Sequence, residues 1–181
     1  LAGRPVMNGR RYGNLDQSDA VQCLVAVYSP TDMYQLDLCD RTTAEDQAAA
    51  TDGNTVRGDT GEKGMGKMHN QLMGVSCMDN PEIAATASPI KFVNGNFPPA
   101  YFLQGVQDRI IPYTQSVSMV RMVNEKCGEG HAELKLFPNA DHGAVEMKTD
   151  EEVNLILDFI DRHIWEGEHL RTPLPKEIAL L

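Results

Sequence analysis

Three apolar segments with the pattern of β-strands, separated by segments with the pattern of helices, most restrict the folds open to this chain. The segments are VQCLVAVY at 21–28, AYFLQG at 100–105 and AELKLF at 132–137. The first two are nearly continuous in apolar residues, which is typical of strands buried on both faces of a parallel sheet. The third alternates more, which favours a strand with one partly solvent-exposed face, as at a sheet edge.

Two amphipathic patterns follow the second and third strands. Valines recur at three-residue steps between 117 and 123, and glycines at 128 and 130 end that pattern. Residues 149–165 begin with a capping residue and an acidic first turn, and then carry an apolar stripe. Strands separated by helices predict parallel pairing with right-handed crossovers. We therefore expect an α/β fold with about three parallel strands and flanking helices.

The length of 181 residues favours one domain, which we interpret as a single partial domain over residues 1–181. Residues 40–70 are rich in Gly, Thr and Asp, so we expect a flexible surface insertion there, and residues 166–181 form a C-terminal tail with two prolines. The first residue is Leu1, and the opening segment lacks the apolar core of a signal peptide. We expect the natural start of the protein to lie upstream.

Composition excludes several classes of partner. Sixteen Lys and Arg against 26 Asp and Glu give a formal net charge of −10, which argues against nucleic acid or anionic membrane. No apolar run approaches the roughly 20 residues that cross a bilayer, so we expect a soluble protein whose compartment stays open. The four cysteines have no metal-site spacing, although a Cys39–Cys77 disulfide remains open. We expect neither metal nor cofactor.

Polar residues follow each predicted strand: Asp32, Asp108 and His142. Ligands of parallel α/β sheets bind outside the carboxyl ends of the strands. Asp108 and His142 stand in the order acid, then base, which is the order of the last two members of an α/β-hydrolase Ser…Asp…His triad. A single aspartate or a D-H-G turn is common loop chemistry, so the pair carries the prediction. We expect the carboxylate and the imidazole within about 2.6–3.2 Å.

The segments ASPIKFVNGNFPPAYFLQGVQDRIIPYTQS at 87–116, LKLFPNADHGA at 134–144 and VQCLVAVYSPTDM at 21–33 make the chain resemble a known superfamily. It is similar to the C-terminal portion of α/β-hydrolases, nearest to bacterial esterase/lipase enzymes of the acetyl-esterase and feruloyl-esterase-like group. The resemblance covers about residues 19–165. It implies that Asp108 is the triad acid, that His142 is the base, and that Asp32 is a turn residue without a catalytic role.

The family's nucleophile motif, G-x-S-x-G, is absent from this sequence, as is an HGGG-type oxyanion loop. Ser76 in GVSCM comes nearest but lacks the second glycine. We therefore expect the nucleophilic serine to lie outside this chain, and the function to be hydrolysis of a small-molecule carboxylic ester. Two alternatives stay open: a prolyl-oligopeptidase-like serine peptidase, and a non-catalytic module that has lost the nucleophile.

The portion that we expect upstream of this chain also affects the edge of the predicted sheet. In the fold that the resemblance implies, the 21–28 strand pairs with an earlier strand, and this segment has neither proline nor lysine to protect an open edge. We expect the Val21–Tyr28 strand to be an exposed edge, or to pair with the missing N-terminal half or with another chain. We also expect the isolated chain to be marginally stable or prone to aggregation.

Overall fold

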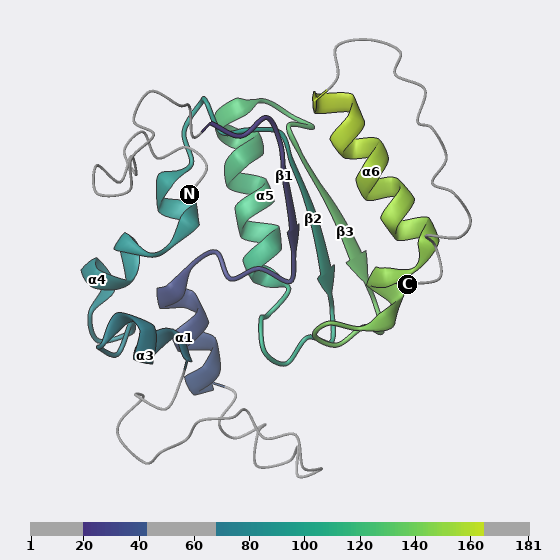
Figure 1. Ribbon diagram of the computed structural model, residues 1–181. Coiled ribbons are helices and arrows are strands. Elements are labelled where there is room, and N and C mark those ends of the chain that lie inside the picture. Colours follow the sequence, from purple (N-terminus) through teal and green to yellow (C-terminus); the bar gives the residue numbers. More distant parts are fainter. Residues whose placement is uncertain (1–19, 43–67, 165–181) are drawn as a thin grey trace, which may run out of the picture.

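A three-stranded parallel sheet forms the centre of the computed structural model, which describes residues 20–42 and 68–164 (Figure 1). Its strands are β1 (Leu24–Val27), β2 (Ala100–Gly105) and β3 (Ala132–Phe137), in the order β1-β2-β3. Both pairings are parallel, and Leu24, Ala100 and Ala132 lie in register. The predicted fold class is confirmed. β1 is shorter than the apolar run that predicted it.

One helix packs on each face of the sheet, because successive side chains of a strand point to opposite faces. Phe102 lies in a cluster with Met119 and Val123 of α5 (Thr114–Cys127). Its neighbours in β2, Tyr101 and Leu103, lie in a second cluster with residues of α6 (Asp150–Ile164). All six residues of β2 are buried, whereas β3 is partly exposed, as its alternating sequence predicts.

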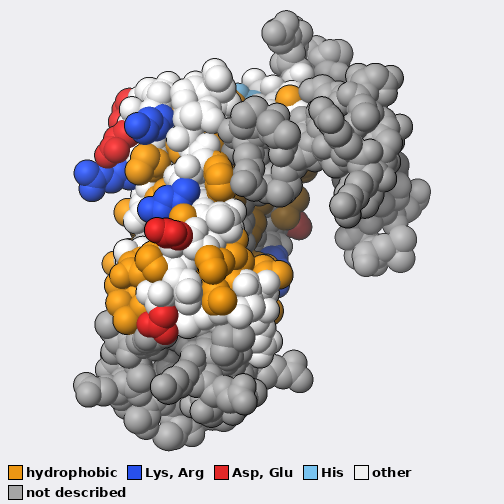
Figure 2. All heavy atoms as spheres, turned by 90° about the vertical axis from the view of Figure 1, so that its left-hand side faces the viewer, with side chains coloured by type: hydrophobic (Ala, Val, Ile, Leu, Met, Phe, Trp, Pro, Cys, Tyr) orange, Lys and Arg blue, Asp and Glu red, His pale blue; other side chains and the backbone are white. Residues whose placement is uncertain are grey.

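A group of short helices lies beside the sheet, on the left of Figure 1. Its members are α1 (Met33–Thr42), α3 (Met68–Met73) and α4 (Pro81–Thr86), followed by the 3-10 helix η1 (Pro89–Phe92). A third apolar cluster joins this group to Ile111 in the loop after β2. Figure 2 faces this side and shows exposed hydrophobic side chains in several groups, separated by charged and other polar atoms.

Three expectations about the flanking segments need correction or lie outside the described residues. The predicted insertion at 40–70 overlaps α1 at one end and α3 at the other, so both ends are helical, and the rest lies outside the described residues. The 166–181 tail also lies outside them. Cys77 is a buried free thiol, so the Cys39–Cys77 disulfide is not formed. No helix among the described residues is long and apolar enough to span a membrane.

The direction of the strands positions the site. All three run the same way, so their carboxyl ends meet at one edge of the sheet, at the bottom of Figure 1. The loop after β2 and the loop after β3 therefore lie next to each other. The second of these loops continues into the 3-10 helix η2 (Val145–Lys148), which precedes α6.

Candidate active site

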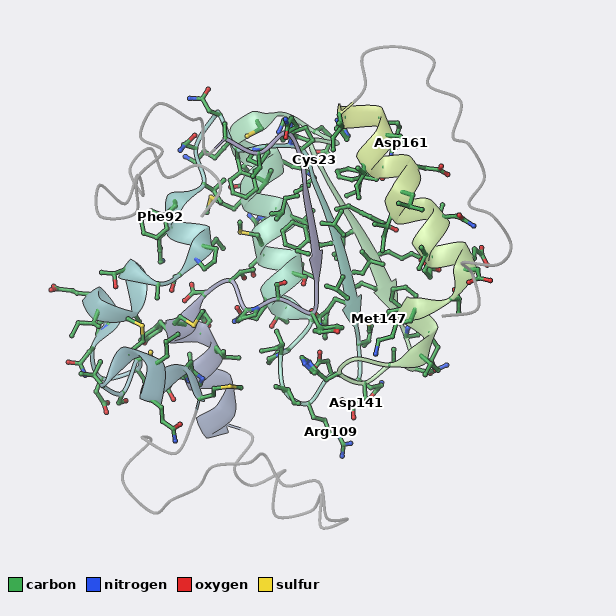
Figure 3. The ribbon with its side chains drawn as sticks, viewed as in Figure 1. Cys23, Phe92, Arg109, Asp141, Met147 and Asp161 are labelled. Carbon is green, nitrogen blue, oxygen red and sulfur yellow. The ribbon has the colours of Figure 1, made fainter. Side chains whose placement is uncertain are left out.

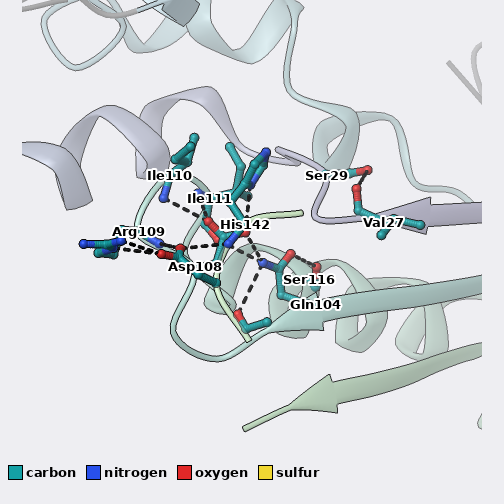
Figure 4. Close-up of polar contacts among 11 residues, drawn as sticks. Val27, Ser29, Gln104, Asp108, Arg109, Ile110, Ile111, Ser116 and His142 are labelled. Atoms are coloured by element: carbon teal, nitrogen blue, oxygen red, sulfur yellow. Dashed lines mark hydrogen bonds and ion pairs between the residues drawn. The ribbon is translucent and has the colours of Figure 1, made fainter. Parts of the chain in front are cut away.

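Asp108 and His142 meet at the carboxyl edge of the sheet. Nδ1 of His142 lies 2.9 Å from Oδ2 of Asp108 (Figure 4), within the distance range that the sequence predicts. The Asp108 side chain is fully buried, whereas the imidazole is 30% exposed. An ionised carboxylate only accepts hydrogen bonds, so the shared proton belongs on Nδ1 and the neutral ring carries a lone pair on Nε2. Nε2 has no partner among the described residues.

The Asp108 carboxylate is held by donors on both oxygens. Oδ1 accepts hydrogen bonds from the backbone N–H groups of Ile110 at 2.9 Å and Ile111 at 2.8 Å. Oδ2 accepts from His142 and, at 2.9 Å, from the side-chain amide of Gln104. All four neighbours are donors, so the arrangement suits the ionised form and leaves the carboxylate little freedom to rotate.

A second contact joins the same two loops, between the residue after Asp108 and the residue before His142. Arg109 donates from Nε at 2.9 Å and from Nη2 at 2.7 Å to Oδ2 of Asp141, and its backbone N–H donates to Oδ1 at 3.1 Å. Both side chains lie below the carboxyl ends of the strands in Figure 3. Burial would by itself raise the pKa of Asp141, but hydrogen bonds from the His142 backbone N–H and from Arg109 lower it below its ordinary value.

The backbones of the two loops approach closely at Gly105, the last residue of β2. A Cβ atom placed there would lie 2.3 Å from the carbonyl oxygen of Ala140. The neighbouring Gln107 N–H donates to that same oxygen at 3.0 Å, and Val106 N–H donates to the carbonyl of Phe137 at 2.9 Å. Only glycine allows this approach, which brings the loop bearing Asp108 within reach of His142.

Tyr28 lies against the imidazole, although no sequence pattern predicted a role for it. Its ring centroid is 4.4 Å from that of His142, with an angle of 54° between the planes. Its backbone φ is 42°, in the left-handed region that bulky residues rarely adopt. Its N–H donates to the carbonyl of Leu103 at 2.9 Å, so the end of β1 is tied to β2 beside the base.

Asp32, the third predicted position, has a different task. Its Oδ1 accepts hydrogen bonds from the backbone N–H groups of Tyr34 and Gln35, both at 3.1 Å. This is the geometry of an N-cap, and α1 begins at the next residue. Asp32 has no contact with the acid–base pair, in keeping with the turn role that the sequence resemblance implies.

No serine hydroxyl or cysteine thiol of the described side chains, at residues 20–38 and 68–164, is hydrogen-bonded to His142. Ser76 donates to Asp37 at 3.3 Å, Ser29 to the Val27 carbonyl at 3.4 Å and Ser116 to Gln104 at 3.1 Å. Nor do the described residues contain a group of three or more His, Cys, Asp and Glu side chains that could hold a metal ion. The described part of the chain thus presents an acid and a base without a nucleophile beside them.

A parallel α/β sheet that carries such a pair on the loops after its last two strands defines a class, the α/β-hydrolases. Within it, the family model BD-FAE matches residues 7–123, which is more than half of the chain. The chain therefore belongs to the BD-FAE family, an α/β-hydrolase-like esterase family. The match includes Asp108 and ends before His142.

Solved structures share the fold at low sequence identity. The chain matches a bifunctional GH43-CE protein of Bacteroides eggerthii with a TM-score of 0.61 and 21% identity, over 83% of this chain and 18% of that one. A truncated carbohydrate esterase from gut microbiota matches with a TM-score of 0.59 and 19% identity, over 83% and 45%. Pyrococcus horikoshii acylaminoacyl peptidase matches with a TM-score of 0.55 and 15% identity, over 85% of this chain and 22% of that one.

These identities establish the fold and no more. The chain spans less than half the length of each of these three structures. A comparison with curated protein sequences found no match.

Proposed function

We propose that this chain supplies the acid and the base of a Ser-Asp-His triad that hydrolyses small-molecule carboxylic esters. The observation that carries the proposal is the 2.9 Å contact between Nδ1 of His142 and the buried Asp108 carboxylate, which leaves Nε2 without a partner among the described residues. Membership of an esterase family supports the reaction class. The nucleophile is a serine outside this sequence, on a G-x-S-x-G turn.

The geometry suits proton transfer in both directions. His142 Nε2 takes the proton from the serine Oγ as that oxygen attacks the ester carbonyl carbon, and gives it to the leaving alcohol oxygen when the tetrahedral intermediate collapses. A water molecule then attacks the acyl-enzyme in the same way, with His142 again transferring the proton. Asp108 keeps the imidazole in the Nδ1–H tautomer and stabilises the imidazolium that forms in each half-reaction.

The test is made in a protein that contains this chain together with an upstream G-x-S-x-G segment. His142→Ala is expected to lower kcat for a p-nitrophenyl acyl ester by about 10⁴-fold or more, because members of a triad act as a unit. The matched control is His163→Gln, since His163 lies on α6 against Phe159 and is expected to leave kcat unchanged. Full activity in His142→Ala would contradict the assignment.

The 181-residue chain by itself is expected to hydrolyse the same ester no faster than solvent does, because its sequence has neither the G-x-S-x-G nucleophile motif nor an HGGG-type oxyanion loop. The measurement is turnover by the purified chain and by its Ser76→Ala variant. Robust hydrolysis that disappears in Ser76→Ala would make Ser76 the nucleophile, despite its hydrogen bond to Asp37.

Peptide hydrolysis is the second candidate, because an acylaminoacyl peptidase shares the fold. A peptide anilide assayed beside the acyl ester distinguishes the two, since the better substrate by kcat/KM identifies the activity.

A third candidate is a non-catalytic module. An upstream coding sequence with Gly or Ala in place of the nucleophilic serine would favour it.

A further inference from the structure

Gln104 is the one amide side chain of β2, and it is completely buried. Its neighbours in the strand are apolar except for the tyrosine hydroxyl and the terminal glycine. Burying an amide in such surroundings is unfavourable unless both its oxygen and its nitrogen find partners. The buried amide of Gln104 therefore needs hydrogen-bond partners for both atoms.

Both ends of the amide are engaged. Nε2 donates to Oδ2 of Asp108 at 2.9 Å and to the carbonyl oxygen of Ile111 at 3.0 Å, and Oε1 accepts from the hydroxyl of Ser116 at 3.1 Å (Figure 4). The opposite orientation would place the amide oxygen against a carboxylate and a carbonyl, neither of which can donate. The partners therefore determine which way the amide points.

These contacts form one continuous chain from α5 to the imidazole. Ser116, which is also fully buried, orients Gln104; Gln104 holds Oδ2 of Asp108; and that same oxygen accepts from Nδ1 of His142. The two backbone donors, Ile110 and Ile111, both hold Oδ1. Gln104 is thus the only donor besides the base itself, among the described residues, that fixes Oδ2.

We propose that Gln104 is a positioning residue of the triad: its amide holds Oδ2 of Asp108 in the place where Nδ1 of His142 can donate to it, and Ser116 locks the amide. The role rests on the proposed function of the Asp108–His142 pair. A merely structural amide that bridges β2 to α5 would be replaceable by an apolar side chain of similar length without effect on the imidazole.

The test substitutes Gln104→Met, which keeps the length of the side chain and removes its donor. The matched control is Gln115→Met, because Gln115 is also a buried amide, hydrogen-bonded to the Thr31 and Asp32 backbones, and has no contact with Asp108. The readout is the downfield proton resonance of the His142 Nδ1–H in the 181-residue chain at low temperature. It is assigned by its loss in His142→Gln.

We expect that resonance to move or broaden in Gln104→Met and to stay in place in Gln115→Met. In a protein that also carries the nucleophile, Gln104→Met is expected to lower kcat about 10- to 100-fold with KM unchanged. Losses of this size are typical when a residue that orients a functional side chain is removed. An unchanged resonance and kcat in folded Gln104→Met would overturn the positioning role.

Two further results keep the inference separate from the proposed function. Absence of the resonance from the wild-type chain, or its persistence unchanged in Asp108→Asn, would refute the acid–base pair itself.

Should Gln104→Met fail to fold, the test uses Ser116→Ala, because it leaves Gln104 in place and removes the hydroxyl that orients it. A smaller displacement of the same resonance supports the proposal, and an unchanged resonance overturns it.

Discussion

Among the described residues, Tyr28 is the only one other than glycine with a positive φ. Strained backbone of this kind persists where the surrounding structure holds it, and it occurs preferentially at functional sites. Here the N–H of the strained residue is bonded to Leu103 and its ring lies on His142. The strained residue therefore lies next to His142, with its ring in contact with the imidazole.

Gly105 is the residue whose substitution the geometry restricts most. In Gly105→Ala the new methyl group would meet the Ala140 carbonyl at 2.3 Å, and a backbone atom cannot move aside as a side chain can. We expect a loss of about 1–3 kcal/mol in the free energy of unfolding, the usual range for overpacking. Urea titration followed by far-UV circular dichroism measures it.

The matched control is Gly95→Ala, where the nearest atom to the new methyl is the Lys126 carbonyl at 3.7 Å, an ordinary contact. It is expected to change the stability by less than about 1 kcal/mol. Equal effects of the two substitutions would show that the approach between Gly105 and Ala140 is looser than the geometry indicates.

At the scale of elements, two ion pairs join β3 to α6, and the more buried of them is Lys135–Glu152; the other, Arg162–Glu133, is exposed. Lys135 Nζ donates to Oε1 of Glu152, whose side chain is 8% exposed against 34% for the lysine. The hydrogen bond to Glu152 raises the pKa of Lys135 above its ordinary 10.5. A lysine with a raised folded-state pKa stabilises the protein below the unfolded value, so this contribution is present at neutral pH and disappears only as the pH rises through the folded value.

Lys135→Met is expected to lower the free energy of unfolding at pH 7 by about 1–3 kcal/mol, because it leaves the buried Glu152 carboxylate without its cation. The double variant Lys135→Met/Glu152→Leu should recover most of that loss, since it removes the buried charge too. Chemical denaturation of both single variants and of the double variant gives the coupling energy.

The control for this cycle is Arg121→Met on α5. Its partner Glu125 is half-exposed and one helical turn away, so the expected change is about 0.5 kcal/mol or less. A double variant no more stable than Lys135→Met would mean that Glu152 is not penalised by burial.

At the scale of the whole molecule, β1 is the edge strand of the described sheet, as the sequence predicts. The N–H groups of Leu24 and Tyr28 donate to the backbone of Pro99 and Leu103 on the β2 side. Because backbone groups alternate along a strand, the N–H groups of Val25 and Val27 point to the open edge. An edge of this kind, with apolar side chains on both faces, favours association with another strand.

We expect the amides of Val25 and Val27 to exchange much faster than those of Leu24 and Tyr28 in a demonstrably monomeric sample of the chain. Another polypeptide that pairs with this edge, such as a second copy of the chain, should slow their exchange. Hydrogen exchange followed by NMR measures each amide, with the doubly paired β2 strand as the protected reference. Protection of Val25 and Val27 near the global stability in the monomer would show that the chain closes its own edge.

The sequence by itself determined the class of fold and the candidate pair. Local periodicity determines whether a segment is a strand or a helix, and the order of those segments predicts a parallel sheet. Because the strands are parallel, Asp108 and His142, which come after the second and third strands, lie at the same edge of the sheet. Gln104 was not predicted, although the lone glutamine in the apolar run AYFLQG could have indicated it, because a buried amide requires partners.

The tertiary structure decided the contacts that surround the pair. Three contacts join segments that are far apart in the sequence: the Arg109–Asp141 ion pair, the approach of Gly105 to Ala140, and the ring of Tyr28 on His142. Such contacts depend on strand register and on where each loop turns, which no local pattern specifies. For the same reason the sequence placed helical residues in the 40–70 insertion and left open a disulfide that Cys77 does not make.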